Sequence, residues 1–193
     1  MNETRDKWNS DGTKFECSVS AFSDTVIVTM KGVKAHVLVP AMMDFLTWPF
    51  IIGIDMGMFF RGAVSSGKFY QSGNVLIGPA VDEAAEWYTK PQWIGVSTTP
   101  SASILVERAL EDDVQLLNKI SHYKVPLKKG AESCWTFSWP MHKVLKDYLK
   151  KKDITLQSWF LEAESNRPLD SSAKTKIDNT IKYIDRFTGR GPD

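Results

Sequence analysis

Apolar and β-branched residues near the start of the chain form two short runs that meet at an acidic turn. The runs FECSVSAFS and TVIVTMK flank Asp24 in the turn Ser23-Asp24-Thr25, and this pattern predicts a β-hairpin. A carboxylate held at the tip of rigid strands suits Mg²⁺ or Mn²⁺, which bind carboxylate oxygens and share their other positions with substrate phosphates. The alternative is that Asp24 serves only the turn, where Asp is favoured for its backbone hydrogen bonding.

A second segment, from Arg61 to Glu86, is typical of a hairpin that leads into a helix. Its sequence is RGAVSSGKFYQSGNVLIGPAVDEAAE, and a helix is predicted from about Ala80 to Trp87. The residues from Gly62 to Lys68 also match Gly-x-x-x-x-Gly-Lys, the start of a phosphate-binding P-loop. A P-loop continues with Ser or Thr and then a helix. Here Phe69 and hairpin-type residues follow, so we exclude a P-loop.

The apolar stretch AHVLVPAMMDFLTWPFIIGIDMGMFF, residues 35–60, raises the alternative of a membrane span. Pro40, Asp44, Pro49 and Asp55 argue against it, because an isolated helix in a bilayer accommodates them only at a cost. The sequence instead predicts a buried helix that starts near Pro40, a residue favoured in first turns. Its Met and aromatic side chains are typical of a core and are also compatible with a subunit contact.

The rest of the chain alternates between strand and helix signals. We predict a strand over 93–99, a helix from Pro100 toward Asn118, a strand over 135–139, an amphipathic lysine-rich helix over 142–152 and a last helix over 171–187. No linker or repeat divides the chain. These signals predict one α/β domain over residues 1–193, an α+β sandwich with helices packed on a mainly antiparallel sheet.

In order and spacing these motifs resemble the class III nucleotide cyclases, and most closely the small pyrimidine cyclases of the bacterial Pycsar antiphage system. The similarity lies in RGAVSSG, in IGPA followed by an acidic, Ala-containing helix, and in the SDT turn. Lys182-Tyr183, in a helix that carries Asn179-Thr180, looks like the tail of the same family. The resemblance implies the class III cyclase fold, with its motifs in 15–90 and C-terminal helices in 142–187.

The resemblance also implies a reaction. The ribose 3′-hydroxyl of a nucleoside triphosphate attacks its own α-phosphate, pyrophosphate leaves, and a 3′,5′-cyclic nucleotide forms. Two metal ions, Mg²⁺ or Mn²⁺, can activate the hydroxyl and neutralise the leaving oxygens. In the family two Asp residues hold these ions, and Asp24 matches the second of them.

The first metal-binding Asp of the family lies on an apolar strand that precedes the hairpin, and no such strand is found here. Asp6 and Asp11 are the only aspartates before Phe15, and both lie in a polar, turn-rich segment. Either the sequence lacks the start of the domain, or the protein is a cyclase homologue that has lost half of its metal site. We expect the former.

The resemblance also assigns roles to further residues and indicates which base the substrate nucleotide carries. Ser20 and Val75 stand where purine cyclases carry their base-selecting side chains, so a pyrimidine nucleotide is expected, with UTP favoured over CTP. Asp82 and Glu86 replace an Asn and an Arg of the family, which leaves Arg61 or Lys68 to supply positive charge. The catalytic candidates are Asp24 and Arg61, and the substrate-binding candidates are Ser20, Phe22, Ser23, Lys68, Asn74 and Asp82. The alternative for Arg61 is an ion pair at a strand end.

Composition narrows the remaining classes of function. The 193 residues carry a formal net charge of +1, which gives no general attraction to nucleic acid or to anionic membranes. Cys17 and Cys134 are too few for a disulfide framework, and His36, His122 and His142 lack metal-ligand spacing.

We expect a cytoplasmic homodimer whose cyclic nucleotide activates a separate effector protein. The second hypothesis is a non-catalytic, cyclase-like module for nucleotide binding or dimerisation, and the third is an unrelated α/β protein.

Overall fold

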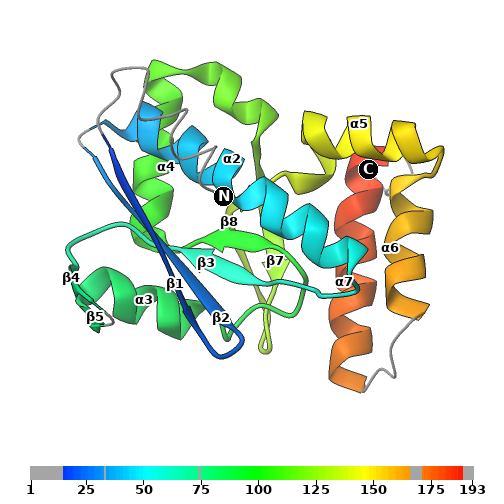
Figure 1. Cartoon of the computed structure of the whole chain (residues 1–193), viewed down its shortest axis with the longest axis horizontal. Coiled ribbons are helices and arrows are strands. Elements are labelled where there is room, and N and C mark those ends of the chain that lie inside the picture. Colours follow the sequence, from blue (N-terminus) through cyan, green and yellow to red (C-terminus); the bar gives the residue numbers. More distant parts are fainter. Residues whose placement is uncertain (1–14, 33, 74, 166–170, 189–193) are drawn as a thin grey trace.

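The protein has a mixed α/β fold with sheets rich in antiparallel pairs, as the sequence predicts (Figure 1). The structure is a computed structural model that describes residues 15–32, 34–73, 75–165 and 171–188. Helices α5, α6 and α7 gather at one end of the molecule, and helix α3 lies with the small hairpin β4–β5 at the other.

The N-terminal hairpin is confirmed. Strands β1 (Glu16–Phe22) and β2 (Thr25–Lys31) pair antiparallel along their whole length, and Phe22 lies opposite Thr25. The two residues between the strands make a tight turn in which Ser23 has a left-handed backbone with φ of 56°. Among the described strands this hairpin forms a sheet of its own.

The main sheet has the strand order β3-β6-β8-β7. Strands β3 (Gly62–Val64) and β6 (Val96–Thr98) are parallel, whereas β8 (Ala131–Phe137) runs antiparallel to both β6 and β7 (Ile120–Pro126). Strand β7 was not predicted. The second hairpin was predicted to include β3, and this was wrong: the hairpin consists of β4 (Tyr70–Ser72) and β5 (Val75–Ile77) alone. Strand β3 joins β6 instead, because helix α3 supplies the crossover that a parallel pair requires.

The helices follow the sequence prediction with two differences. Helix α2 covers Ala35–Asp55, so it begins before Pro40, and both Pro40 and Pro49 lie inside it. Helix α6 (Leu156–Ser165) was not predicted. The other helices are α3 (Pro79–Trp87), α4 (Pro100–Asp112), α5 (Lys143–Lys152) and α7 (Ser171–Thr188), with short 3₁₀ helices at Val114–Asn118 and Trp139–Met141.

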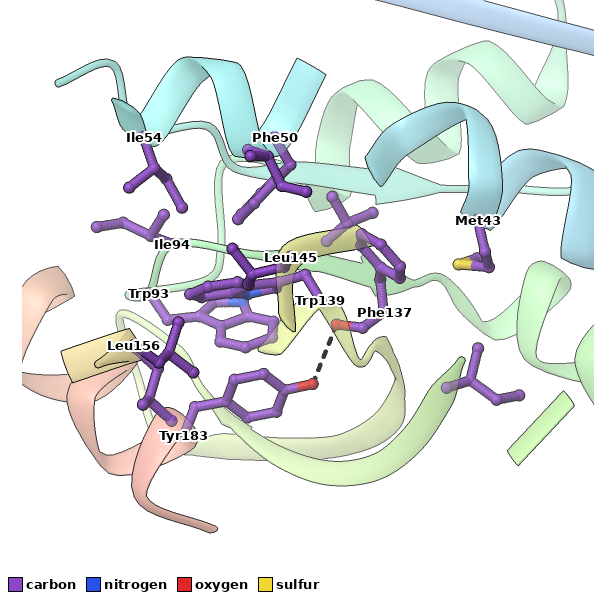
Figure 2. Packing of buried hydrophobic residues seen from close by; sticks show 14 of the residues in the cluster. Met43, Phe50, Ile54, Trp93, Ile94, Phe137, Trp139, Leu145, Leu156 and Tyr183 are labelled. Atoms are coloured by element: carbon purple, nitrogen blue, oxygen red, sulfur yellow. Dashed lines mark hydrogen bonds between the residues drawn. The ribbon is translucent and has the colours of Figure 1, made fainter. Parts of the chain in front are cut away.

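The core is an aromatic cluster between α2, α7 and the main sheet (Figure 2). The Phe50 ring of α2 packs on Trp139 at a centroid distance of 5.1 Å. From α7, the hydroxyl of Tyr183 donates to the carbonyl oxygen of Phe137 at 3.1 Å. Trp93 fills the space beside Tyr183 with its ring edge-on at 4.6 Å. These contacts anchor the end of the sheet that β7 and β8 form.

Helix α2 is, among the described residues, the one helix whose length and composition would allow it to cross a membrane. Its mean hydropathy reaches 1.8, and half of the residues in its most apolar window are buried inside the protein. Val39, Met43, Phe50, Ile51 and Ile54 belong to the hydrophobic core. In this structure α2 therefore has the role of a core helix, since its apolar side chains cover the sheet.

Candidate functional site

A large cavity separates the N-terminal hairpin from the main sheet. Strand β2 forms one wall, β3 and the loop after it form another, and residues of helices α2, α3 and α4 complete the lining. Its volume is about 1610 Å³, whereas pockets for one small ligand usually measure about 300–1,000 Å³. The cavity therefore has more room than one nucleotide requires.

The loop at 65–68 is fixed at the N-terminal ends of two helices. The Ser65 hydroxyl donates to the carbonyl oxygen of Ala80 in α3 at 2.6 Å. The backbone N–H of Ser66 donates to the hydroxyl oxygen of Ser101 in α4 at 2.9 Å. The N–H of Ala80 reaches the carbonyl oxygen of Lys68 at 3.4 Å. The loop is thus held in place by contacts with residues distant in the sequence.

Gly78 allows α3 to approach this loop closely. Its φ of 136° lies in the region that favours glycine, and a Cβ there would stand 2.8 Å from the carbonyl oxygen of Lys68 and 2.9 Å from the Cα of Phe69. A side chain would have to displace backbone atoms rather than a flexible side chain. The glycine between LI and PA in the IGPA motif is therefore required by packing as well as by conformation.

Glu83 links the two helices that hold the loop. Its carboxylate accepts the backbone N–H of Ser101 at 3.2 Å and also the Ser101 hydroxyl. A carboxylate at the first turn of α4 satisfies a free N–H and complements the helix dipole. Sequence reasoning missed this pair because the two residues lie on different helices. The only local signal was Thr99-Pro100-Ser101, which is typical of a helix start.

Of the predicted site residues, three line the cavity: Asp24, Arg61 and Lys68. Ser20, Phe22 and Ser23 belong to the same hairpin as Asp24, and Asp82 is exposed on the first turn of α3, but the cavity lining does not include them. Asn74 lies outside the described residues, as do Asp6 and Asp11.

Arg61 is half-buried and, within the described residues, has no carboxylate partner. Its guanidinium donates to the carbonyl oxygen of Pro91 at 3.5 Å and lies 5.9 Å from the centroid of the Tyr88 ring. The alternative for Arg61 is an ion pair at a strand end. In the part of the chain that the structure describes, no carboxylate forms that ion pair. Arg61 retains donors for an anionic ligand.

The described residues of the cavity do not provide enough ligands for a metal site. Asp24, which is exposed and accepts a 3.4 Å contact from the Thr25 hydroxyl, is the one carboxylate among the described lining residues. No group of three or more His, Cys, Asp or Glu side chains that could hold an ion occurs in the described ranges. A two-metal centre of the kind implied by the resemblance requires a second acidic ligand, so the residues present do not fit it.

Comparisons with models of protein families, with curated proteins and with solved structures found no match to this chain. The cavity and the residues around it are therefore the structural basis for a function.

Proposed function

We propose that this protein binds a pyrimidine nucleoside triphosphate in the cavity and acts as a nucleotide cyclase of the class III type. One observation carries the proposal. Asp24, from the first hairpin, and Arg61 with the loop at 65–68, from the second motif, line the same cavity although they are far apart in the sequence. These are the two segments on which the resemblance depends.

The charges of the lining support an anionic ligand. Lys31, Arg61 and Lys68 line the cavity together with Asp24, so three cations oppose one carboxylate. Of these cations, Arg61 and Lys68 form no ion pair within the described residues, while Lys31 lies 3.9 Å from Glu16. Fixed positive groups beside a triphosphate stabilise the charge on its oxygens. The loop at 65–68 is already held in place by its hydrogen bonds, so it would reorganise little when the triphosphate binds.

The proposed reaction makes one bond and breaks another. The 3′-oxygen of the ribose bonds to the α-phosphorus, the bond from that phosphorus to the bridging oxygen of the β-phosphate breaks, and the hydroxyl proton is lost to solvent or a base. The products are 3′,5′-cyclic UMP or CMP and pyrophosphate. Arg61 and Lys68 would orient the phosphates and offset their charge. We assign no step to a metal ion, because the described residues provide only Asp24 as a ligand.

We further propose the setting that the resemblance implies, a cytoplasmic homodimer in antiphage defence whose product activates an effector. The exposed apolar side chains of hairpin β4–β5 support self-association, since Tyr70, Val75 and Ile77 are each more than half exposed.

A second candidate function is nucleotide binding without catalysis. The lone carboxylate in the described lining favours it, because two-metal chemistry requires more than one.

The test is incubation of the purified chain with Mn²⁺ and each of ATP, GTP, CTP and UTP, followed by mass spectrometry and, separately, by equilibrium dialysis of the nucleotide. Cyclic UMP or CMP that Asp24→Asn and Arg61→Ala abolish would support the cyclase. Asp178→Asn, an exposed change on α7, is the matched control and should retain activity. Binding without any product would favour the second candidate. Absence of both binding and product would refute both.

A further inference from the structure

Helix α5 begins at a histidine that caps it. His142 is the N-cap residue, and its Nδ1 atom accepts the backbone N–H of Val144 at 3.3 Å. Its carbonyl oxygen accepts the backbone N–H of Lys146 at 3.1 Å, the first hydrogen bond of the helix. Side-chain oxygens of Ser, Thr, Asp and Asn are the usual caps. An imidazole nitrogen can replace them only while it carries no proton.

The other ring nitrogen of His142 points to helix α2. Its Nε2 atom lies 3.5 Å from Oδ1 of Asp44. Because a carboxylate oxygen only accepts, Nε2 carries the proton. Both contacts therefore require one form of the ring, the neutral imidazole with its proton on Nε2. The ring is well enclosed, since 13% of the His142 side chain is exposed.

His36 has the opposite arrangement in the same chain. Its Nδ1 atom lies 2.7 Å from Oδ2 of Asp112, at the C-terminal end of α4. In neutral His36 the proton therefore lies on Nδ1. Protonation of His36 leaves its contact with Asp112 in place, whereas protonation of His142 removes the acceptor that its helix uses.

The charges around the capping imidazole act in both directions. Asp44 on α2 favours a charged ring, whereas the ammonium of Lys119, 2.6 Å from the same oxygen, disfavours it. The N-terminal end of α5 also disfavours a cation, because helix N-termini carry partial positive charge. The Phe137 ring of β8 lies 6.3 Å away and adds no charge. On α5 itself the nearest charged side chains are the exposed Lys143 and Lys146.

We propose that His142 is a proton-sensitive cap, which holds the first turn of α5 when it is neutral and releases that turn when it is protonated. Protonation places an N–H at Nδ1 opposite the N–H of Val144, and two donors form no hydrogen bond. The imidazolium keeps its Nε2–H on the Asp44 carboxylate, where the added charge strengthens the contact. The side chain thus stays attached to α2 while α5 loses its cap. Histidine changes charge between about pH 5 and 8, so acidification in that range operates the cap.

The rest of α5 has anchors that this proton does not reach. Leu145 and Leu149 belong to the hydrophobic core. The Tyr148 hydroxyl donates to Asp55 at the C-terminal end of α2, and Nε1 of Trp159 in α6 donates to the same carboxylate at 3.3 Å. We therefore expect the first turn to fray while the helix stays docked. The cap lies outside the cavity lining, so its behaviour is independent of the proposed function.

The first measurement determines the tautomer. Long-range ¹H–¹⁵N NMR of the full chain at a pH of about 8 distinguishes a protonated from an unprotonated ring nitrogen. We expect the proton on Nε2 in His142 and on Nδ1 in His36, with His142→Asn used to assign the signals. A proton on Nδ1 of His142 would overturn the proposal, and this result needs only the parent protein.

The second measurement follows the helix from a pH of about 8 to about 5.5. Protection of the Val144 and Lys146 amides against hydrogen exchange, corrected for intrinsic rates, should fall by about fivefold with the midpoint of the His142 ring signals. In His142→Asn, which has a preferred cap that does not titrate, the change should stay below about twofold. His122→Asn, at an exposed histidine of β7, is the matched control and should respond like the parent. Constant protection in the parent, or a response that persists in His142→Asn, would overturn the proposal.

Discussion

The Nζ atom of Lys119 lies 2.6 Å from Oδ1 of Asp44, so an ion pair joins the middle of helix α2 to the residue before strand β7. Nε2 of His142 lies 3.5 Å from the same oxygen. Burial alone would raise the pKa of Asp44, but the hydrogen bonds and charges of His142 and Lys119 outweigh it, and the pKa is lowered. The ionised carboxylate therefore stabilises the fold.

Asp44→Asn should lower the free energy of unfolding by about 1–3 kcal/mol at pH 7. Because folding lowers the pKa of Asp44, its contribution is present above the unfolded pKa of about 4 and is lost as the pH falls through the folded pKa. Urea denaturation at pH 7 and at a pH of about 3 checks this, and the variant should lose less stability on acidification than the parent. An equal loss in both proteins would show that Asp44 is not the group responsible.

Tyr183→Phe should destabilise the protein by about 1–2 kcal/mol. The Tyr183 hydroxyl is buried, donates to the carbonyl oxygen of Phe137 and lies 2.9 Å from the hydroxyl of Thr136. Its removal takes these hydrogen bonds away, although the Thr136 hydroxyl still donates to the carbonyl oxygen of Ser121. Thermal unfolding measures the effect. Tyr70→Phe is the control, since Tyr70 is 60% exposed. Similar melting temperatures for the two variants would contradict the importance of the buried network.

Gly78→Ala should be more damaging than Gly73→Ala, although both glycines have positive φ. At Gly73 an added Cβ meets nothing within 4 Å, so only the backbone conformation costs energy, about 1 kcal/mol. At Gly78 the added atom also collides with the backbone at Lys68. We expect a further loss of about 1–3 kcal/mol in denaturant titrations, together with weaker nucleotide binding. Equal losses at both positions would argue against the close approach of α3 to the loop.

Cys134 should resist alkylation in the folded protein. Burial raises the pKa of its thiol to about 12, and the charge of Glu132 acts in the same direction. At a pH of about 8 the thiolate population is then on the order of a thousandfold below that of an ordinary cysteine. Iodoacetamide labelling followed by peptide mass spectrometry should modify Cys17 first and Cys134 only after unfolding in urea. Equal rates in the folded state would contradict this.

Local signals were sufficient for several elements of the fold. The turn chemistry around Asp24 predicted β1 and β2, and helical spacing predicted α3, α5 and α7 close to their observed bounds. The predicted start of α2 near Pro40 is too late, because Pro40 favours a first turn but lies inside the helix. Strand β7 was missed because its sequence, ISHYKVP, is partly polar and becomes a strand through its pairing with β8.

The candidate site was predicted in part. The motifs pointed to Asp24, Arg61 and Lys68, which the structure brings to one cavity, and also to Ser20, Phe22, Ser23 and Asp82, which it leaves outside the lining. For the contact between Glu83 and Ser101 the sequence offered only the helix start at Thr99-Pro100-Ser101, which does not point to Glu83. Such pairs depend on how α3 and α4 approach each other in space.

The sequence by itself determined the local elements, namely the hairpin at Asp24, the helix after Gly78 and the amphipathic helices α5 and α7, because turn residues and hydrophobic spacing act over a few positions. Only the tertiary structure decided that β3 pairs with β6 rather than with the second hairpin and that a cavity remains beside β2 and β3. These features arise from contacts between distant segments, whose pairing depends on which surfaces can be buried together.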